Sequence, residues 1–377
     1  MMHKECKDRD APPVGLGQFW FCATALFVVV FVALAASILA HQNPRTASVM
    51  IWNRQMCGPR LIVIGTQKGG TTSLYKYIKN VTWISVGKTK ELHFFDKVYK
   101  SRRKWDTVND LKALQQKYLK DFGLDVVHGG LSPLRESRDD TCTDYRTGLT
   151  FCCDDPNTVY SDVTPRYMII PQAPRLIRRI TNNPWIVALL REPAARAVSH
   201  FRMEFGSDDG KNLDDFASEF HQNVHRGIKV TKKCLSEQKI SGIDCQRRLS
   251  LDHDVDMVSR GLYAHHLRPW FSTFGREKLV LWVSERFSDD PEGHLISLQN
   301  QIVGANVSVS REIFQQDYNV KYNVDVQTVE PWESTVKILR EFYEPYNREL
   351  VYMLMEWGYY DVARDIRQLW DISLKSA

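Results

Sequence analysis

The sequence of 377 residues has no internal repeat, no low-complexity run and, after residue 60, no second linker. These absences exclude a repeat array and a disordered chain, and 43% hydrophobic with 25% charged residues is typical of a globular protein. The charge excess is small, because 50 Lys and Arg stand against 45 Asp and Glu. A net charge of +5 is compatible with a polyanionic partner without requiring one, and we expect no nucleic-acid partner.

One long segment lacks charge altogether. Phe19–Ala40 is long enough to cross a bilayer and longer than the core of a signal peptide. The lysines and arginine that precede it favour a cytoplasmic N-terminus, although three acids offset them. The sequence therefore predicts a single-pass type II protein with a cytoplasmic tail (1–18), a signal anchor (19–40), a luminal stem (41–59) and a catalytic domain (60–377). A cleaved signal peptide is the alternative, because Ala35–Ala40 resembles a cleavage site.

Cysteines are few, and the pairs that follow the anchor lack the close C-x-x-C spacing of a zinc knuckle. We therefore expect no metal site. Six of the eight cysteines would lie in an oxidising lumen, an even number suited to disulfides. Cys234 and Cys245 flank a polar segment and form the favoured pair, and pairing of Cys142 with Cys152 or Cys153 stays open. Asn80 and Asn306 lie in N-x-[ST] tripeptides and would accept glycans in the lumen.

Strand-like and helical patterns alternate after residue 60. Such alternation predicts an α/β fold, a parallel sheet covered by helices on both faces, whose ligands bind at the carboxyl ends of the strands. The expected strands are Leu61–Gly65, Trp83–Val86, Thr158–Val163, Trp185–Leu190 and Leu279–Glu285. The expected helices are Ser73–Lys79, Asp110–Phe122, Ala173–Ile180, Ala194–Phe205, Leu213–Val230, Tyr263–Phe274 and Ser334–Glu356. Asp125–Asn157, rich in Gly, Pro, Asp and Ser, is expected to be irregular.

The stretch from Leu61 to Asn80, LIVIGTQKGGTTSLYKYIKN, is the most informative. A buried strand, a glycine-bearing loop and a helix N-terminus follow one another, which is an arrangement that binds oxyanions. The loop offers one positive charge, two glycines and three hydroxyl groups: Lys68, Gly69, Gly70, Thr71, Thr72 and Ser73. We therefore predict a phosphate-binding loop. A glycine-rich turn that binds nothing is the alternative.

This loop differs from that of nucleotide triphosphatases. Their motif, GxxxxGK[ST], places the lysine directly before the hydroxyl, whereas Lys68 precedes the glycines. A kinase would also need an Asp at the end of an apolar strand to hold Mg²⁺. The strand Trp185–Leu190 is followed by Arg191, and Asp162 is the nearest substitute. A luminal P-loop glycan kinase is therefore a rival interpretation.

A second phosphate element follows the strand Trp185–Leu190, in REPAARAVSH. Arg191 can form a bidentate contact with a phosphate, and Ser199 can add a hydroxyl donor. Arg196 is a weaker candidate. Alternatively, Arg191 pairs with a neighbouring acid and Ser199 only packs against its surroundings.

A possible base lies in GKTKELHFFD, after the second strand. Transfer of a group to a sugar hydroxyl needs a base for its proton and positive charge beside the leaving group. Glu91 is the expected base, Lys68 the stabiliser of the leaving group, and His93 the second candidate as base. Lys88 and Lys90 could bind acidic groups of an acceptor. Glu91 could also be an ordinary surface carboxylate.

A dense basic run, KVYKSRRK, follows from Lys97 to Lys104. Lys97, Arg102 and Arg103 could edge a polyanion-binding cleft, or the run could be a solvated loop.

Five motifs recur in this order in Golgi carbohydrate sulfotransferases: KGGTTSL, KTKELHFFD, REPAARAVSHF, GLYAHHLRPWFSTF and LREFYEPYNREL. The chain from about Arg60 to Tyr360 resembles the group that holds heparan sulfate 3-O- and N-sulfotransferases. It is most similar to N-acetylgalactosamine 4-sulfate 6-O-sulfotransferase, in which an insertion like the one around Cys234 and Cys245 also occurs.

The resemblance implies a P-loop nucleotide-kinase-like fold and a reaction that uses 3′-phosphoadenosine 5′-phosphosulfate (PAPS) without a catalytic metal. By position, residues 68–73 would bind the 5′-phosphosulfate, Arg191 and Ser199 the 3′-phosphate, and Glu91 would act as the base. Tyr263 would line the cleft or pack in a helix, and His265 and His266 would be structural. The implied acceptor is a glycosaminoglycan, either the 6-O position of N-acetylgalactosamine in chondroitin or dermatan sulfate, or heparan sulfate. A homo-oligomer and a non-catalytic glycan-binding relative stay open.

Two features depart from the family. Heparan sulfate 3-O-sulfotransferases carry a Lys-Gly-Arg loop that closes on the donor, and Lys321 is the nearest basic candidate here. The Glu-Pro-His of relatives is Glu-Leu-His in this chain, at Glu91–His93.

Overall fold

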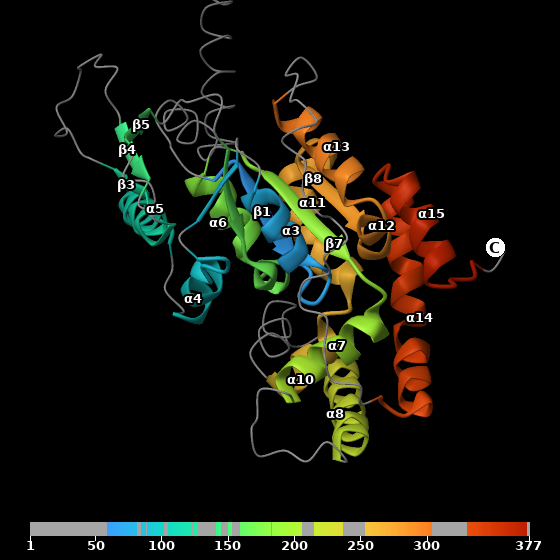
Figure 1. Cartoon of the computed structure of the whole chain (residues 1–377). Coiled ribbons are helices and arrows are strands. Elements are labelled where there is room, and N and C mark those ends of the chain that lie inside the picture. The colour runs from blue at the N-terminus through green and yellow to red at the C-terminus, as the bar shows by residue number, and fades with distance from the viewer. Residues whose placement is uncertain are drawn as a thin grey trace, which may run out of the picture. The chain divides into compact units, whose positions relative to one another are not determined.

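Five parallel strands form the central sheet, in the order β2-β6-β1-β7-β8 (Figure 1). Their bounds are β1 (Leu61–Gly65), β2 (Ile84–Val86), β6 (Val159–Val163), β7 (Trp185–Leu190) and β8 (Leu279–Val283). The register sets Val63 beside Val163 on one side and Val187 on the other. Because all five strands run the same way, their carboxyl ends meet at one edge of the sheet.

The computed structural model describes residues 59–80, 84–87, 89–101, 105–122, 124–126, 141–144, 150–152, 159–181, 183–205, 215–236, 253–303 and 330–374. The segment expected to anchor the chain, residues 19–40, lies outside these ranges. Among the described residues, no helix has the length and apolar character needed to cross a membrane. Several predicted site residues also lie outside them: Lys88, Arg102, Arg103, Cys245, Asn306 and Lys321.

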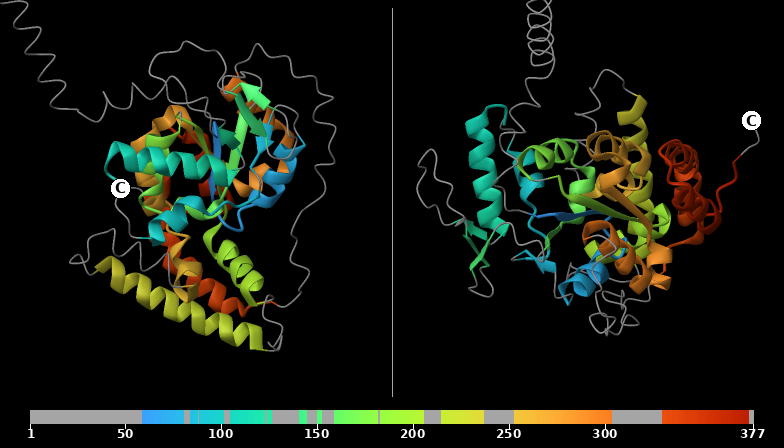
Figure 2. Two further views of the ribbon diagram at one scale, coloured as in Figure 1. Left: turned by 90° about the vertical axis from the view of Figure 1, so that its left-hand side faces the viewer. Right: turned by 90° about the horizontal axis from the view of Figure 1, so that it is seen from above.

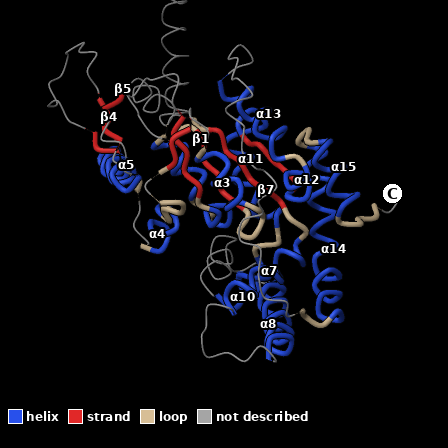
Figure 3. Tube along the Cα trace, in the orientation of Figure 1, coloured by secondary structure: helices blue, strands red, loops and turns tan. Residues whose placement is uncertain are grey.

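Side chains of the strands alternate between two apolar layers, as the pleat of a sheet requires. Leu61 and Val63 face a layer that contains buried side chains of α3 (Thr71–Lys79), α12 (Ser284–Asp289) and α13 (Pro291–Val303). Ile62 and Ile64 face the other layer. Its helices are α4 (Phe94–Lys100), α5 (Val108–Phe122), α6 (Ala173–Ile180), α11 (Tyr263–Lys278), α15 (Tyr360–Leu369) and the second half of α14 (Glu333–Glu356). Figure 3 shows the strands enclosed by these helices.

A third apolar cluster lies beyond β7 and contains no strand residue. It joins α7 (Pro193–Phe205), α8 (Phe216–Ser236), α10 (His253–Ser259) and the first half of α14. Phe201, Phe216 and Phe220 contact one another there, with ring centroids 5.2 to 6.2 Å apart. Figures 1 and 2 show these helices gathered at the end of the sheet from which α7 begins.

The sequence pattern located the parallel sheet correctly. All five expected strands are present, and α5, α6, α7, α8, α11 and α14 fall on expected helices. Two expectations were wrong. The last strand ends at Val283 and not at Glu285, because Ser284 begins α12. The segment expected to be irregular contains an antiparallel sheet of β3 (Leu124–Val126), β4 (Thr141–Asp144) and β5 (Thr150–Cys152). Its strands are short and partly polar, so they lack the apolar alternation that marks a strand.

Candidate active site

A cavity of about 470 Å³ opens at the carboxyl ends of β1, β7 and β8. It is lined by the predicted phosphate loop, by Arg191 and by the segment after β8. The lining residues are Lys68, Gly69, Gly70, Ser73, Tyr77, Arg191, Ser284, Glu285, Phe287, Ser288, Asp289 and Pro291. The structure thus brings the two predicted phosphate elements to one cavity, as adjacent parallel strands β1 and β7 require.

The loop after β1 needs its glycines. A Cβ on Gly69 would lie 2.9 Å from the Leu189 carbonyl oxygen of β7, closer than real Cβ contacts allow. Gly70 has φ of 92°, in the left-handed region, and precedes the first residue of α3. Lys68 itself has φ of 66°, unusual for a residue with a side chain. The loop therefore holds its backbone close to β7 and leaves the first N–H groups of α3 without helical partners.

Three strand ends are tied together around the cavity. The Arg191 guanidinium donates through Nη1 to the Lys68 carbonyl oxygen over 3.0 Å. The Ser284 hydroxyl donates to the Gly69 carbonyl oxygen over 2.7 Å. The Tyr263 hydroxyl donates to the Arg191 carbonyl oxygen over 2.8 Å. These bonds fix the lysine and the arginine on a common wall.

The remaining candidates for the second phosphate element are buried in α7. Ser199 is 7% exposed and does not belong to the described lining of the cavity. Of the first phosphate loop, Thr71 and Thr72 lie in the first turn of α3. Arg196 is fully buried and donates to the Met257 carbonyl oxygen, so its weaker candidacy as a phosphate ligand finds no support. Tyr263 is also buried, which favours the expectation that it packs within the fold over the expectation that it lines the cleft.

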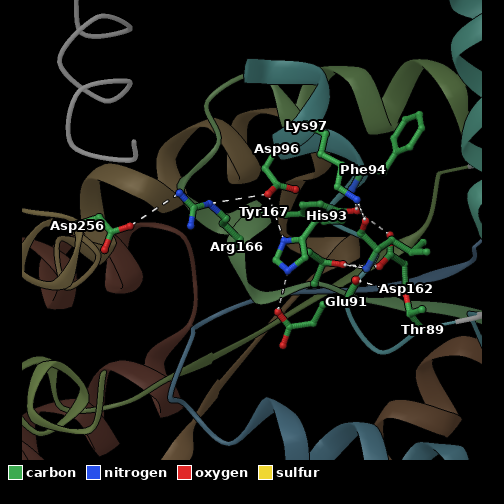
Figure 4. A network of polar contacts seen from close by, with 12 residues as sticks. Thr89, Glu91, His93, Phe94, Asp96, Lys97, Asp162, Arg166, Tyr167 and Asp256 are labelled. Carbon is green, nitrogen blue, oxygen red and sulfur yellow. Dashed lines mark hydrogen bonds and ion pairs between the residues drawn. The ribbon is translucent and has the colours of Figure 1, made fainter. Parts of the chain in front are cut away.

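The predicted base lies two strands from the cavity, after β2, and neither Glu91 nor His93 belongs to the described cavity lining. Glu91 accepts from Lys90 Nζ at 2.6 Å through Oε1, and its Oε2 lies 3.3 Å from His93 Nε2. The other ring nitrogen, Nδ1, lies 3.1 Å from Asp96 Oδ2. Figure 4 shows the three side chains in a row. His93 has φ of 54° and caps α4, which aims its ring between the two carboxylates.

These contacts fix the protonation states. The hydrogen bond with Asp96, followed by the one with Glu91, raises the pKa of His93 to about 9, against a smaller opposing effect of burial. Burial raises the pKa of Glu91, but hydrogen bonds from His93 and Lys90 outweigh it and bring the pKa below its ordinary value. At neutral pH the pair is therefore a carboxylate beside an imidazolium. Glu91 can accept a proton in this state, and His93 cannot.

A buried hydrogen-bond network holds the loop of Glu91. The Leu92 N–H donates to Thr164 Oγ1 over 3.1 Å, and the Phe94 N–H donates to the Tyr167 hydroxyl over 3.1 Å. Both hydroxyls donate in turn to Asp162, as does that of Tyr118. Figure 4 shows Tyr167 and Asp162 beside the loop of Glu91. Burial raises the pKa of Asp162 to about 6 in spite of these bonds. Asp162 is fully enclosed and committed to this network, so it is not placed as a ligand for Mg²⁺.

Arg166 links the base to a more distant helix. Its Nε lies 3.8 Å from Asp96 Oδ2, and its Nη2 lies 3.8 Å from Asp256 Oδ2 on α10 (Figure 4). Asp256 also pairs with Arg260. The side chains of Asp96, Arg166 and Asp256 are 5%, 12% and 0% exposed. Glu91, His93, Asp96, Arg166 and Asp256 thus form a continuous row of alternating charge.

One group of side chains has the composition of a metal site. Oxygen or nitrogen atoms of His200, Glu204 and Asp256 lie within 4.8 Å of one another. Burial, followed by the charges of Arg260 and Arg196, lowers the pKa of His200 well below its ordinary value. This arginine-rich field opposes a cation as it opposes imidazolium, so the group is better described as part of the ion-pair network.

The other predicted residues are placed as follows. Lys90 pairs with Glu91, and Lys97 lies in α4, where its Nζ donates to the Leu92 carbonyl oxygen over 3.2 Å. The basic run therefore begins in a helix and not in a loop. Cys234 is disulfide-bonded, and the pairing with Cys245 stays a prediction. Asn80 is exposed at the end of α3.

Sequence reasoning missed half of the cavity wall. Glu285, Phe287 and Asp289 belong to α12, which follows the fifth parallel strand. The signal is that ligands bind where parallel strands end. The expected strand Leu279–Glu285 includes the first two residues of α12 and so hides this end of the strand. Arg166 and Asp96 were also missed. Arg166 lies in the 3₁₀-helix Pro165–Ile169, which comes after β6, and it is far in sequence from its carboxylate partner Asp96.

Comparisons with known proteins agree with this geometry. A family model described as "Sulfotransferase domain" matches residues 58–302. Human carbohydrate sulfotransferase 15 is 22% identical over 322 residues, which cover 80% of this chain and 54% of that protein. Mouse heparan sulfate glucosamine 3-O-sulfotransferase 3A1 is 22% identical over 267 residues, 71% of this chain and 51% of that protein. The chain thus spans about half the length of these curated relatives.

Among solved structures, a sulfotransferase from Alicyclobacillus acidocaldarius is 17% identical, with a TM-score of 0.48 and coverage of 85% of this chain and 98% of that one.

Proposed function

The chain belongs to the sulfotransferase family, and on that premise we propose that it transfers a sulfuryl group from PAPS to a hydroxyl group of a glycosaminoglycan. The observation that carries the proposal is the common cavity of Lys68 and Arg191. A nucleotide with phosphate groups at both its 5′ and 3′ positions needs two cationic elements, and adjacent strands supply them here.

The residues present fit this donor. The cradle at Gly69 is one that a side chain would fill, and the start of α3 directs N–H groups to the same place. Lys68, Gly69, Gly70, Thr71, Thr72 and Ser73 would hold the 5′-phosphosulfate, and Arg191 with Ser199 the 3′-phosphate. When bound, PAPS supplies the sulfuryl group together with a phosphate leaving group. Lys68 provides positive charge for that phosphate.

Glu91 is the base of the proposed reaction. Its carboxylate is ionised, and it receives the acceptor hydroxyl proton as the oxygen becomes a nucleophile. The protonated His93 holds the carboxylate by charge and hydrogen bonding and does not compete for the proton. Lys88, Lys90, Lys97, Arg102 and Arg103 are the proposed contacts for acidic groups of the acceptor.

The acceptor we propose is N-acetylgalactosamine in chondroitin or dermatan sulfate, modified at the 6-O position. It rests on the resemblance of the five motifs to N-acetylgalactosamine 4-sulfate 6-O-sulfotransferase. Heparan sulfate is the second candidate, because a relative named for 3-O-sulfation of heparan sulfate is as similar to this chain as carbohydrate sulfotransferase 15.

The location we propose is the Golgi membrane, with residues 19–40 as a type II anchor and the catalytic domain in the lumen. The uncharged run supports the anchor. The disulfide at Cys234 supports an oxidising compartment.

The test is transfer of labelled sulfate from PAPS to a panel of desulfated glycosaminoglycans, followed by disaccharide analysis. We expect label at the 6-O position of galactosamine chains and unchanged transfer in chelator. Label confined to heparan-type chains would make heparan sulfate the acceptor in place of the galactosamine chains. Transfer of phosphate from ATP, abolished by chelator, would favour the kinase, and binding of glycan without turnover would favour a non-catalytic relative.

A further inference from the structure

The exposed face of α8 is basic in the second half of the helix. His225, Arg226, Lys229, Lys232 and Lys233 are all exposed. Their spacing of one, four, seven and eight residues from His225 places them on one side of the helix, over about 12 Å of its axis. The single Glu of α8, Glu219, precedes them by more than a turn and is half-buried. This set of five residues is called the α8 basic face below.

All charged side chains of this face have the same sign. Like charges three or four residues apart destabilise a helix by a few tenths of a kcal/mol per pair, and the α8 basic face contains several such pairs. Other surface helices alternate in sign. On α14, Glu333, Glu341 and Glu344 stand among Lys337 and Arg340, all of them exposed. A surface with several exposed charges of one sign attracts a partner with dense negative charge.

The opposite face of α8 is committed to the fold. Phe220, Val224, Gly227, Thr231 and Cys234 are buried there. Phe220 and Val224 belong to the cluster shared with α7, α10 and α14, and Cys234 packs with Val255 of α10. At the edge, Lys232 Nζ lies 5.9 Å from the centre of the Phe342 ring of α14. The basic face therefore points away from the helices that join α8 to the sheet.

We propose that the α8 basic face is a second binding site for a sulfated polysaccharide, which holds a part of the acceptor polymer remote from the sugar at Glu91. This proposal rests on the proposed function for the identity of the polymer. Two contacts on one chain raise the effective concentration of acceptor at the base without a new contact to the reacting sugar. The face therefore promotes reaction with long chains and is irrelevant to short ones.

The test compares two triple variants of the full-length protein in detergent. Lys229→Gln, Lys232→Gln and Lys233→Gln remove three charges from α8. Lys112→Gln, Lys117→Gln and Lys120→Gln remove three exposed lysines from α5, a helix that also carries Asp110 and Asp121. Both variants thus lose the same net charge. The measurements are the salt dependence of binding to chondroitin sulfate and kcat/KM for a long chain and for a hexasaccharide.

We expect the α8 variant to lower the slope of log K against log salt by about 2, if polysaccharide sulfates behave like the phosphates of a single strand. Its kcat/KM should fall roughly tenfold for the long chain and stay unchanged for the hexasaccharide. The α5 variant should match the unsubstituted protein in all three measurements.

Equal loss on both acceptors, equal loss in both variants, or unchanged binding of the α8 variant would overturn the proposal. So would displacement of the unsubstituted protein from the polysaccharide by DNA more readily than by free chondroitin sulfate. The binding measurement needs no turnover. A protein that transfers no sulfate but still loses binding on α8 substitution would therefore contradict the proposed function and support the second site.

Discussion

Replacement of Arg166 by alanine should impair the base although Arg166 does not touch it. Its guanidinium is 3.8 Å from the carboxylates of Asp96 and Asp256. At this distance a unit charge pair is worth about 4 kcal/mol before desolvation, at an effective dielectric constant of about 20. Removal of one member of a buried pair typically costs 3–5 kcal/mol, because the partner stays buried without compensation.

Part of that cost should appear in the rate. Without Arg166, Asp96 keeps only His93 as its cationic partner among the described residues, and a shift of its carboxylate weakens the bond to His93 and then the hold of His93 on Glu91. If about 1–2 kcal/mol of the loss reaches the transition state, kcat falls by roughly 5- to 30-fold. KM for PAPS should not change, because Arg166 is outside the described lining of the cavity.

The assay is a double-mutant cycle on kcat with Arg166→Ala and Asp96→Asn. If Arg166 acts through Asp96, the double variant should be no slower than the slower single variant. Arg166→Lys should recover part of the rate. Arg175→Ala is the matched control, because Arg175 lies 3.8 Å from Asp106 but both side chains are more than 60% exposed, so little should change. Losses that multiply in the double variant, or a loss confined to KM, would refute the reasoning.

Four further outcomes follow. Glu91→Gln should lower kcat by about 10²- to 10⁴-fold and leave binding of adenosine 3′,5′-bisphosphate intact by calorimetry. Gly69→Ala should weaken that binding at least about tenfold, since overpacking costs about 1–3 kcal/mol and the added Cβ would lie 2.9 Å from a backbone oxygen. Thr164→Val should lower the free energy of unfolding in urea by about 1–3 kcal/mol, because it leaves the Leu92 N–H buried without an acceptor. Folding raises the pKa of His93 from 6.5 to about 9. The stability that protonated His93 contributes is therefore complete below about pH 6.5 and is lost as the pH rises through about 9. The difference in urea midpoint between the unsubstituted protein and His93→Gln should shrink as the pH rises through this range.

Each of these has a contrary result. Full activity of Glu91→Gln would remove Glu91 as the base. Normal nucleotide binding by Gly69→Ala would mean that the loop at Gly69 does not bind the donor. Unchanged stability of Thr164→Val would show that its hydrogen bond is replaced by water. A urea midpoint difference that does not depend on pH would mean that His93 is not charged by its two neighbours.

The parts of the site that the sequence could predict are those encoded locally. Lys68, the two glycines and the first residues of α3 form one continuous stretch, so strand, loop and helix could be recognised together. Arg191 directly follows an apolar run, and parallel pairing of β1 with β7 is enough to bring it to Lys68. Glu91 and His93 are predicted in the same way, from their place after a strand.

The contacts that the sequence could not predict join residues far apart in the chain. Arg166 and Asp256 are 90 positions apart, and no periodicity relates them. Thr164 and Leu92 meet because β6 lies beside β2, an order that strand patterns do not determine. The left-handed conformation of Lys68 also has no sequence signal, since lysine does not favour positive φ.

The central claim is that two strand ends hold the two phosphate-bearing ends of one nucleotide. Calorimetric titration of the protein with adenosine 3′,5′-bisphosphate and with adenosine 5′-monophosphate tests it most directly, with Arg191→Ala alongside. The account predicts tighter binding of the bisphosphate and loss of that preference in Arg191→Ala. Equal affinity for the two nucleotides, or an unchanged preference in the variant, would contradict it.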